Sequence, residues 1–276
     1  MSEYGAFEVT QKGDVVTLSI VPLRTALTKK PPADIHREIG FFLNDIRHSW
    51  KPRVIVITGQ VDGEFCVPPP TSNYDSESAF ERLRDPAGQW ATMNGLLHSI
   101  QMMVELPIPI IAKVNGDCIG FGQSVMLACD LIVAREDARI SDVHMGIGKV
   151  VGPDGRTPVG PPIATVPGDG AGALLPLYLS PALAKEYLMF SQVLTGADLA
   201  RLHVINKAVP AAELDRAVAG YIEKILERPA YAIGWTKRVA NRLVMSQLVA
   251  NLDAAGAYEL VNFLQPSTLA PNPTGG

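Results

Sequence analysis

Segments typical of strands and of helices alternate along the first half of this chain, and this alternation restricts the fold more than any other feature. Residues 54–58 (VIVIT) and 110–114 (IIAKV) are largely apolar and β-branched, as is typical of strands covered on both faces. Between them, residues 89–104 have the apolar spacing of an amphipathic helix that ends before Pro107. Strands separated by helices imply right-handed crossovers, so we predict an α/β fold with a mostly parallel sheet.

The same pattern continues on both sides of this unit. Asp34 can cap a helix with a single apolar face, formed by Ile35, Ile39, Phe42, Leu43 and Ile46. Further strands are predicted at 15–20, 131–134 and 138–141, with a turn-rich segment at 115–122 and a helix at 124–129.

The pattern becomes mainly helical after Pro181. We predict helices at 182–191, 211–228, 231–243 and 246–264, and expect only 204–209 to be extended in this half. Residues 1–210 are therefore expected to form the α/β core. Residues 211–276 are expected to form a helical region that packs on this core or on a neighbouring subunit, with a frayed tail at 266–276.

Composition excludes several classes of function. Hydrophobic residues make up 47% of the 276 residues and charged residues 19%, which is enough apolar surface for a folded domain. The 24 basic residues against 28 acidic ones give a net charge of −4. A positive field that could hold phosphate backbones is therefore not expected, and nucleic acid is excluded as a partner. A small molecule is the expected partner.

The chain also has no feature that predicts secretion or membrane insertion. Its three cysteines are an odd number without metal-ligand spacing, which favours a reducing cytoplasm over a disulfide framework. The first residues lack the basic and apolar stretches of a signal peptide. Apolar runs are strand-sized, whereas a membrane span needs about 20 residues. We expect a cytoplasmic protein with no membrane partner.

Two glycine-rich segments are candidates for a functional site. In residues 115–123 (NGDCIGFGQ), Gly120 and Gly122 would let the backbone approach a ligand before a helix start, as in an oxyanion site, or would only make a tight turn. Residues 146–168 contain six glycines and five prolines, so no regular element can persist there. This segment is either a lid or pocket wall, or a tolerated surface insertion.

A wider stretch of sequence carries a family resemblance. Residues 109–130 (PIIAKVNGDCIGFGQSVMLACD), followed by 134–140 (AREDARI), resemble the signature of the crotonase superfamily, which has the enoyl-CoA hydratase/isomerase fold. Residues 63–66, 166–170 and 194–197 extend the resemblance over most of the chain. The resemblance implies a crotonase-like spiral core of ββα turns, a helical C-terminal region, and assembly as a homotrimer or a dimer of trimers.

Departures from the family pattern indicate the reaction type. The family's two hydratase glutamates fall at Gln123 and His144, and a glutamine cannot exchange a proton near neutrality. The first oxyanion donor falls at Pro69, which has no N–H. Gly120 retains the position of the second donor. The resemblance therefore does not support the paired-carboxylate route to hydration.

Within the superfamily the chain is more similar to the β-diketone hydrolases, the group that includes 6-oxocamphor hydrolase. The shared motifs are Asp142-Val-His144 and Val166-Pro-Gly-Asp169-Gly, and His36 and Glu259 match two further site residues of that group. Where that group has another histidine in the glycine turn, this chain has Phe121. The resemblance implies cleavage of a carbon–carbon bond between two carbonyls without a cofactor, coenzyme A or metal.

Retro-Claisen hydrolysis needs a deprotonated water and a stabilised enolate leaving group. A histidine near its ordinary pKa can act as the base, and a carboxylate can orient its ring. We assign His144 as the base and Asp169 as the orienting carboxylate, with His36 and Glu259 holding carbonyls or water. The remaining substrate contacts are expected at Gly120, Phe121, Gln123 and Val67. The alternatives are a structural role for His144 and simple capping of a helix at 170–179 by Asp169.

The leading hypothesis is therefore a hydrolase of a β-diketone, a cyclic one by the resemblance. The alternative is an acyl-CoA hydratase or isomerase that uses Asp169 or Glu259 to move the proton. A third possibility, from another class, is a catalytically silent trimeric scaffold that keeps only the fold.

Overall fold

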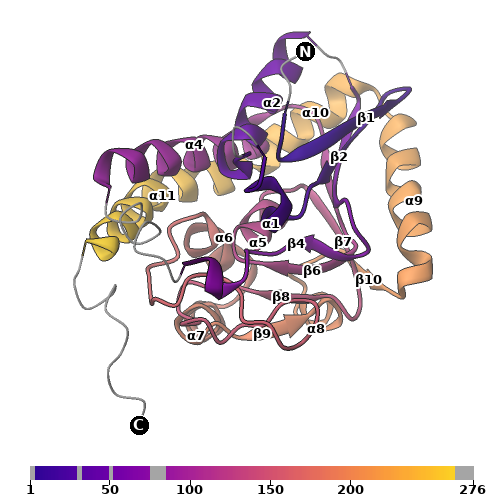
Figure 1. Ribbon diagram of the computed structural model, residues 1–276. Helices are drawn as coiled ribbons and strands as arrows, with labels where there is room; N and C mark the ends of the chain where they lie inside the picture. The colour runs from indigo at the N-terminus through magenta and orange to yellow at the C-terminus, as the bar shows by residue number, and fades with distance from the viewer. Residues whose placement is uncertain (1–3, 30–32, 50–51, 75–84, 265–276) are drawn as a thin grey trace.

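The computed structural model describes residues 4–29, 33–49, 52–74 and 85–264 and shows two sheets with helices around them (Figure 1). The tail expected at 266–276 lies outside these residues. None of the described helices is long and apolar enough to cross a membrane.

The larger sheet has six strands and is mostly parallel, as predicted. Its order is β1-β2-β3-β5-β7-β10, and only the β1–β2 hairpin is antiparallel. Every residue of β3 is buried, which confirms that its continuous apolar run marks a strand covered on both faces. The strands are β1 (Phe7–Lys12), β2 (Val15–Ile20), β3 (Val54–Gly59), β5 (Ile110–Val114), β7 (Leu131–Arg135) and β10 (Lys207–Val209).

Strands of the smaller sheet alternate along the chain with strands of the larger sheet. Its order is β4-β6-β8-β9, and β4, β6 and β8 each come directly after a strand of the larger sheet, so that strand pairs and helices repeat as a ββα spiral. These strands are β4 (Gly63–Cys66), β6 (Gly116–Ile119), β8 (Arg139–Ser141) and β9 (Val193–Thr195).

Two strands of the smaller sheet contradict the sequence prediction. The segment 115–122 was expected to be a turn but contains β6, and β9 lies in the half where only 204–209 was expected to be extended. Gly116 explains the first error, because a Cβ there would lie 1.9 Å from the carbonyl carbon of Gly63. This glycine permits close approach of two strands and does not mark a turn.

The helices cover the sheets on several sides. All five predicted apolar residues of α2 are buried, and the Asp34 carboxylate accepts a hydrogen bond from the His36 N–H at 3.1 Å, as expected for a cap. The helices are α1 (Leu23–Ala26), α2 (Ile35–Ser49), α4 (Pro86–Glu105), α5 (Phe121–Leu127), α6 (Ala171–Tyr178), α7 (Pro181–Phe190), α8 (Gly196–Arg201), α9 (Leu214–Leu226), α10 (Ala230–Ala240) and α11 (Arg242–Phe263), with 3₁₀ turns at Thr71–Tyr74 and Ala211–Glu213.

The last three helices pack onto the rest of the chain. Residues of α9 cover one face of the larger sheet, where Leu214, Val218 and Ile225 pack with residues of β3, β5 and β7. Helix α11 lies along α4 and α6 (Figure 1), and its Leu248 and Leu252 are part of the main apolar core. The division into units 1–210 and 211–276 stays a prediction.

A buried lysine fixes α10 to the core. Nζ of Lys237 lies 2.8 Å from the Asp130 carboxylate and donates to the carbonyls of Met103 and Ile108 at 2.9 and 3.0 Å. Only 4% of the Lys237 side chain is exposed. The ammonium therefore joins α10 to the end of α4, to the turn that follows it and to the residue before β7.

We expect Lys237→Ala to lower the free energy of unfolding by about 3–5 kcal/mol, because it leaves the Asp130 carboxylate without its buried partner. Urea unfolding followed by circular dichroism measures the change. Lys185→Ala is the matched control, since Lys185 is exposed on α7 and its loss should change stability by less than about 0.5 kcal/mol. Equal stability of the two variants would contradict the proposed role of the buried ion pair.

Candidate active site

His144 and Asp142 form a tight pair directly after β8. The His144 N–H donates to Oδ1 of Asp142 at 2.9 Å, and Nδ1 of the ring lies 2.9 and 3.1 Å from the two carboxylate oxygens. The Asp142 side chain is fully buried and that of His144 is 10% exposed. Because the short spacing lets one carboxylate bind both the backbone and the ring, the imidazole is held in one orientation.

Glu259 approaches the other ring nitrogen from α11. Its Oε1 lies 3.4 Å from Nε2 of His144, and its Oε2 is buried without a hydrogen-bond partner among the described residues. Gly168 makes room for this carboxylate, since a Cβ there would lie 2.4 Å from Oε2. The structure thus brings Glu259 to His144 from more than a hundred residues along the chain.

Asp169 completes the group from the turn before α6. Its Oδ1 accepts a hydrogen bond from Oγ of Ser124 at 2.8 Å and lies 3.4 Å from the Ala171 N–H. Three side-chain atoms that could bind a metal lie within 4.8 Å of one another, one each from Asp142, His144 and Asp169. The capping residue of α6 is Gly170, which has no side chain to cap it, so helix capping by Asp169 is limited to this one long contact.

The orienting carboxylate is not the one expected from the sequence. We expected Asp169 to hold the His144 ring, but the hydrogen bond from Nδ1 goes to Asp142. Asp169 is nearby and is held by Ser124 instead. The sequence offered a signal for Asp142, because an aspartate two residues before a histidine can bind both its N–H and its Nδ1.

Three buried carboxylates around one imidazole change its protonation. Burial by itself lowers the pKa of His144, but the charges of Asp142, Asp169 and Glu259 and the Asp142 hydrogen bond outweigh it, so the pKa lies well above 6.5. Burial raises the pKa of Asp169, against the attraction of His144. We expected His144 to have an ordinary pKa, and this is wrong because three carboxylates that are distant in sequence or unassigned surround the ring.

His36 does not join this group directly. Its Nδ1 lies 2.9 Å from the Asp34 carboxylate, and its ring contacts the ring of Phe121 with centroids 4.5 Å apart. Among the described residues, no hydrogen bond or ion pair joins His36 to His144 or to the three carboxylates. Nε2 of His36 is the ring atom left for a ligand.

Gly120 and Gln123, both expected to contact substrate, make hydrogen bonds inside the protein instead. The Gly120 N–H donates to the carbonyl of Ser141 at 2.9 Å and extends the β6–β8 pairing, so in this structure it is not free to bind a substrate oxygen. Oε1 of Gln123 accepts a hydrogen bond from the Tyr187 hydroxyl at 2.8 Å, and both side chains are buried. Sequence reasoning missed Tyr187, because a tyrosine in a predicted helix gave no sign of its partner.

The segment 146–168 packs against the site and has no helix or strand, as predicted. Its Thr165 N–H donates to the His144 carbonyl at 2.8 Å, and its Gly160 N–H donates to the carbonyl of Pro69 at 3.0 Å. Val67 is buried in a small apolar cluster with Val143 and with residues of this segment. The segment therefore forms a wall beside His144 and Val67.

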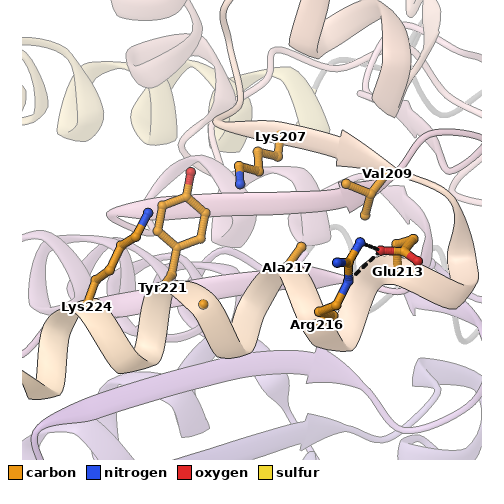
Figure 2. A pocket seen from close by; sticks show the side chains of 8 residues that line it. Lys207, Val209, Glu213, Arg216, Ala217, Tyr221 and Lys224 are labelled. Carbon is orange, nitrogen blue, oxygen red and sulfur yellow. Dashed lines mark hydrogen bonds and ion pairs between the residues drawn. The ribbon is translucent and has the colours of Figure 1, made fainter.

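One cavity lies away from the candidate catalytic residues. A groove of about 270 Å³ runs between β10 and α9 and is lined by Lys207, Arg216, Tyr221 and Lys224 among others, as Figure 2 shows. Its charged side chains are paired or lie over the Tyr221 ring. The groove contains none of the candidate catalytic residues.

Within the part of the chain that the structure describes, Asp142, His144 and Asp169 are the group of three side chains close enough to share a metal ion. Hydrogen bonds hold these groups in place, from Nδ1 of His144 to Asp142 and from Ser124 to Asp169. That the protein works without a metal or a cofactor stays a prediction.

Comparison with known proteins identifies the architecture. The family model described as "Enoyl-CoA hydratase/isomerase" matches residues 32–262. A short-chain-enoyl-CoA hydratase of Clostridium acetobutylicum is 22% identical, over 82% of this chain and 77% of that protein. A crotonyl-CoA hydratase of Syntrophomonas wolfei is 24% identical, over 68% of this chain and 64% of that protein. The chain thus spans less than two thirds of the length of this second relative.

Solved structures show the same fold. An enoyl-CoA hydratase/isomerase from Mycobacterium paratuberculosis superposes with a TM-score of 0.78 at 22% identity, covering 97% of both chains. A β-diketone hydrolase from Anabaena sp. PCC 7120, solved with (S)-3-oxocyclohexyl acetic acid bound, gives 0.76 at 18% identity, covering 95% of both chains. At these identities the likeness establishes the fold alone, and it confirms the predicted crotonase-like architecture.

The raised pKa of His144 predicts how stability depends on pH. The folded pKa lies above the ordinary 6.5, so the imidazolium stabilises the fold fully below pH 6.5, and this contribution is lost as the pH rises through the folded pKa. The difference in free energy of unfolding between the wild type and His144→Gln should therefore shrink from pH 6 to pH 9, measured by urea unfolding. A difference that grows with pH would contradict this charge state.

Proposed function

This chain belongs to the enoyl-CoA hydratase/isomerase family, and we propose that within it the protein hydrolyses the carbon–carbon bond between the two carbonyls of a β-diketone, preferably a cyclic one. The observation that carries the proposal is the His144 imidazole held between Asp142 and Glu259, with Asp169 beside it. An imidazole flanked by carboxylates can take a proton from water and return it to a leaving group.

Two positions support this reaction over a thioester reaction. The Gln123 amide does not ionise near neutrality, so it cannot act as an acid or a base, and its oxygen already accepts a hydrogen bond from Tyr187. Pro69 offers no N–H where the family resemblance places an oxyanion donor. Loss of one such donor typically costs about 10²–10³ in rate, so a reaction through a thioester enolate is disfavoured here.

The proposed reaction uses water as the only co-reactant. The reactive form is the neutral imidazole, whose share grows as the pH rises through the raised pKa of His144. Its Nε2 takes a proton from water, and the water oxygen bonds to one carbonyl carbon. The bond from that carbon to the central carbon then breaks, and its electron pair forms the enolate of the second carbonyl. The imidazolium returns the proton to the central carbon, which leaves a carboxylic acid and a ketone. With a cyclic substrate both groups stay on one keto acid.

The other residues have supporting roles in this proposal. Asp142 fixes the His144 ring and stabilises the imidazolium. Glu259 and Asp169 position water and raise the pKa of the ring. Nε2 of His36 and the Phe121 ring that it contacts would meet the second carbonyl and the carbon skeleton. With the Gly120 N–H used in the sheet, His36 becomes the leading candidate for binding that carbonyl. The ligand of the Anabaena hydrolase is a keto acid, the product class that this reaction gives.

The alternative function is an acyl-CoA hydratase or isomerase. Curated relatives with names such as short-chain-enoyl-CoA hydratase favour it, and Asp169 or Glu259 would then move the proton. A silent scaffold is the third possibility. Binding of an acyl-CoA, measured by calorimetry, separates the alternative from the leading proposal.

We also propose a cytoplasmic homotrimer or a dimer of trimers. The support in the structure is an exposed apolar stripe on and just after α10, formed by Tyr231, Trp235, Val239 and Leu243 at intervals of four residues. Such a stripe is unusual on a surface that faces only water. A second copy of the chain would cover it.

Incubation with a panel of monocyclic and bicyclic 1,3-diketones tests the proposed reaction. We expect mass spectrometry to show products heavier than their substrates by one water, and reaction in H₂¹⁸O should place the label in the new carboxyl group. Crotonyl-CoA is the comparison substrate. If the protein turns over crotonyl-CoA and changes none of the diketones, the hydratase function replaces this proposal. Inertness toward both, with a well-ordered oligomer, would favour the scaffold.

Variants of the His144–Asp142 pair test the proposed mechanism. We expect His144→Ala to abolish turnover and to remain folded but less stable, because three buried carboxylates lose the charge that compensates them. Asp142→Asn removes a charge that raises the pKa of His144, so kcat/KM should fall and its rise with pH should move to lower pH. Turnover is measured from pH 5 to 10, with circular dichroism as the folding control. An insoluble His144→Ala protein would indicate a structural histidine instead.

A further inference from the structure

A cavity of about 450 Å³ lies beside the segment 146–168. Most of its lining comes from within residues 145–151 and 189–193, so it joins this segment to the end of α7 and to β9. Volumes of this size are typical of sites that bind small molecules. None of the candidate catalytic residues lines it. The cavity is therefore separate from the candidate active site, although its lining begins at the residue after His144.

The wall of this cavity carries exposed apolar side chains. Met145 and Ile147 are 38% and 49% exposed on one side, and Met189 and Phe190 are 57% and 69% exposed on the other. Apolar groups that gather at one place on a surface mark a binding site. Methionine side chains are flexible and polarisable, so they adapt to apolar partners of different shapes. We therefore expect the ligand to have an apolar body.

The charged side chains that line the cavity are both basic. Arg139 is paired with Asp117 and also donates to the Gly152 carbonyl. Lys149 is exposed and forms no ion pair among the described residues. The chain as a whole has a net charge of −4, so a cavity lined by basic and no acidic side chains is a local exception. The free ammonium of Lys149 favours a ligand with a negative charge.

A buried hydroxyl at the end of α7 lacks a hydrogen-bond partner. Ser191 is 7% exposed and lines the cavity, and its Oγ forms no hydrogen bond among the described residues. This Oγ lies on the side of Gly146, where a Cβ would be 3.6 Å from it. A buried hydroxyl without a partner is costly. Rotation about its Cα–Cβ bond would let it donate to an oxygen of a ligand in the cavity.

The backbone around the cavity is strained at two residues. The φ angle is +52° at Ile147 and +45° at Ser191, a region that favours glycine and that a β-branched residue rarely adopts. Ser191 follows α7 in this left-handed conformation, where glycine is the usual residue. Strained residues cluster at ligand sites, where the surrounding structure holds them. The strain at Ser191 therefore accompanies the unpaired hydroxyl at the same position.

We propose that this cavity binds a small organic carboxylate with an apolar body. Lys149 pairs with the carboxylate, and the Ser191 hydroxyl donates a hydrogen bond to it. The apolar body packs against Met145, Met189 and Phe190. The proposal adds a second ligand site to the protein and does not rest on the proposed function, because no residue of the His144 cluster takes part in it.

Calorimetric titration of the full chain with octanoate tests the proposal. We expect saturable binding, and octanol should bind at least about 10-fold more weakly, because it has the same chain length but no charge. Lys149→Glu should weaken octanoate binding by at least about 10-fold, since it places a like charge beside the carboxylate. Lys185→Glu is the matched control, because Lys185 is exposed on α7 but does not line the cavity. Its affinity for octanoate should match that of the wild type.

Ser191→Gly separates ligand binding from stability. Glycine accepts the left-handed backbone and removes the unpaired hydroxyl, so urea unfolding should show a variant at least as stable as the wild type. Octanoate should bind it about 5-fold more weakly, because one hydrogen bond to the carboxylate is lost. An unchanged affinity would contradict the role of this hydroxyl.

The remaining outcomes distinguish other occupants of the cavity. Absence of octanoate binding to the wild type, or equal affinities of Lys149→Glu and Lys185→Glu, would overturn the proposal. Binding that is lost in His144→Gln but kept in Lys149→Glu would place octanoate in the candidate active site instead. If Phe190→Asp changes the oligomeric state in light scattering and the wild type binds no octanoate, a second copy of the chain covers the cavity and the carboxylate site is wrong.

Discussion

The site depends on one interaction, the contact between the Asp142 carboxylate and Nδ1 of His144. Two further carboxylates, Asp169 and Glu259, are buried around the same ring. Burying several negative charges is costly unless a positive charge or a hydrogen bond compensates them. The imidazolium supplies that charge, so the ring both stabilises the cluster and is its only basic member. Its raised pKa follows from this shared dependence.

The fold creates the cluster by joining segments from four parts of the chain. The end of β8 contributes Asp142 and His144, the start of α6 contributes Asp169, α5 contributes Ser124, and α11 contributes Glu259. Each repeat of the spiral places a strand end near the next, and α11 then closes over α4 and α6. The spiral and the C-terminal helix are therefore both needed to complete the site.

Much of the architecture was predictable because its signals are local. The uniformly apolar run of β3 could only be a covered strand, and the apolar face of α2 followed from helical spacing. Gly116 misled us, because a glycine that permits two strands to approach looks the same in sequence as a glycine in a turn. The family resemblance pointed to His144, Asp169 and Glu259, which the structure brings together. It did not reveal which carboxylate holds the ring, since that depends on a side-chain orientation set by tertiary contacts.

The position of Glu259 in α11, later in the chain than both sheets, has a consequence for the order of events during synthesis. Both sheets and their covering helices can emerge from the ribosome before α11 is complete. The cluster around His144 lacks its last carboxylate until that helix has docked on α4 and α6. Docking of α11 is therefore the event that brings the last carboxylate to His144, and it can follow formation of both sheets.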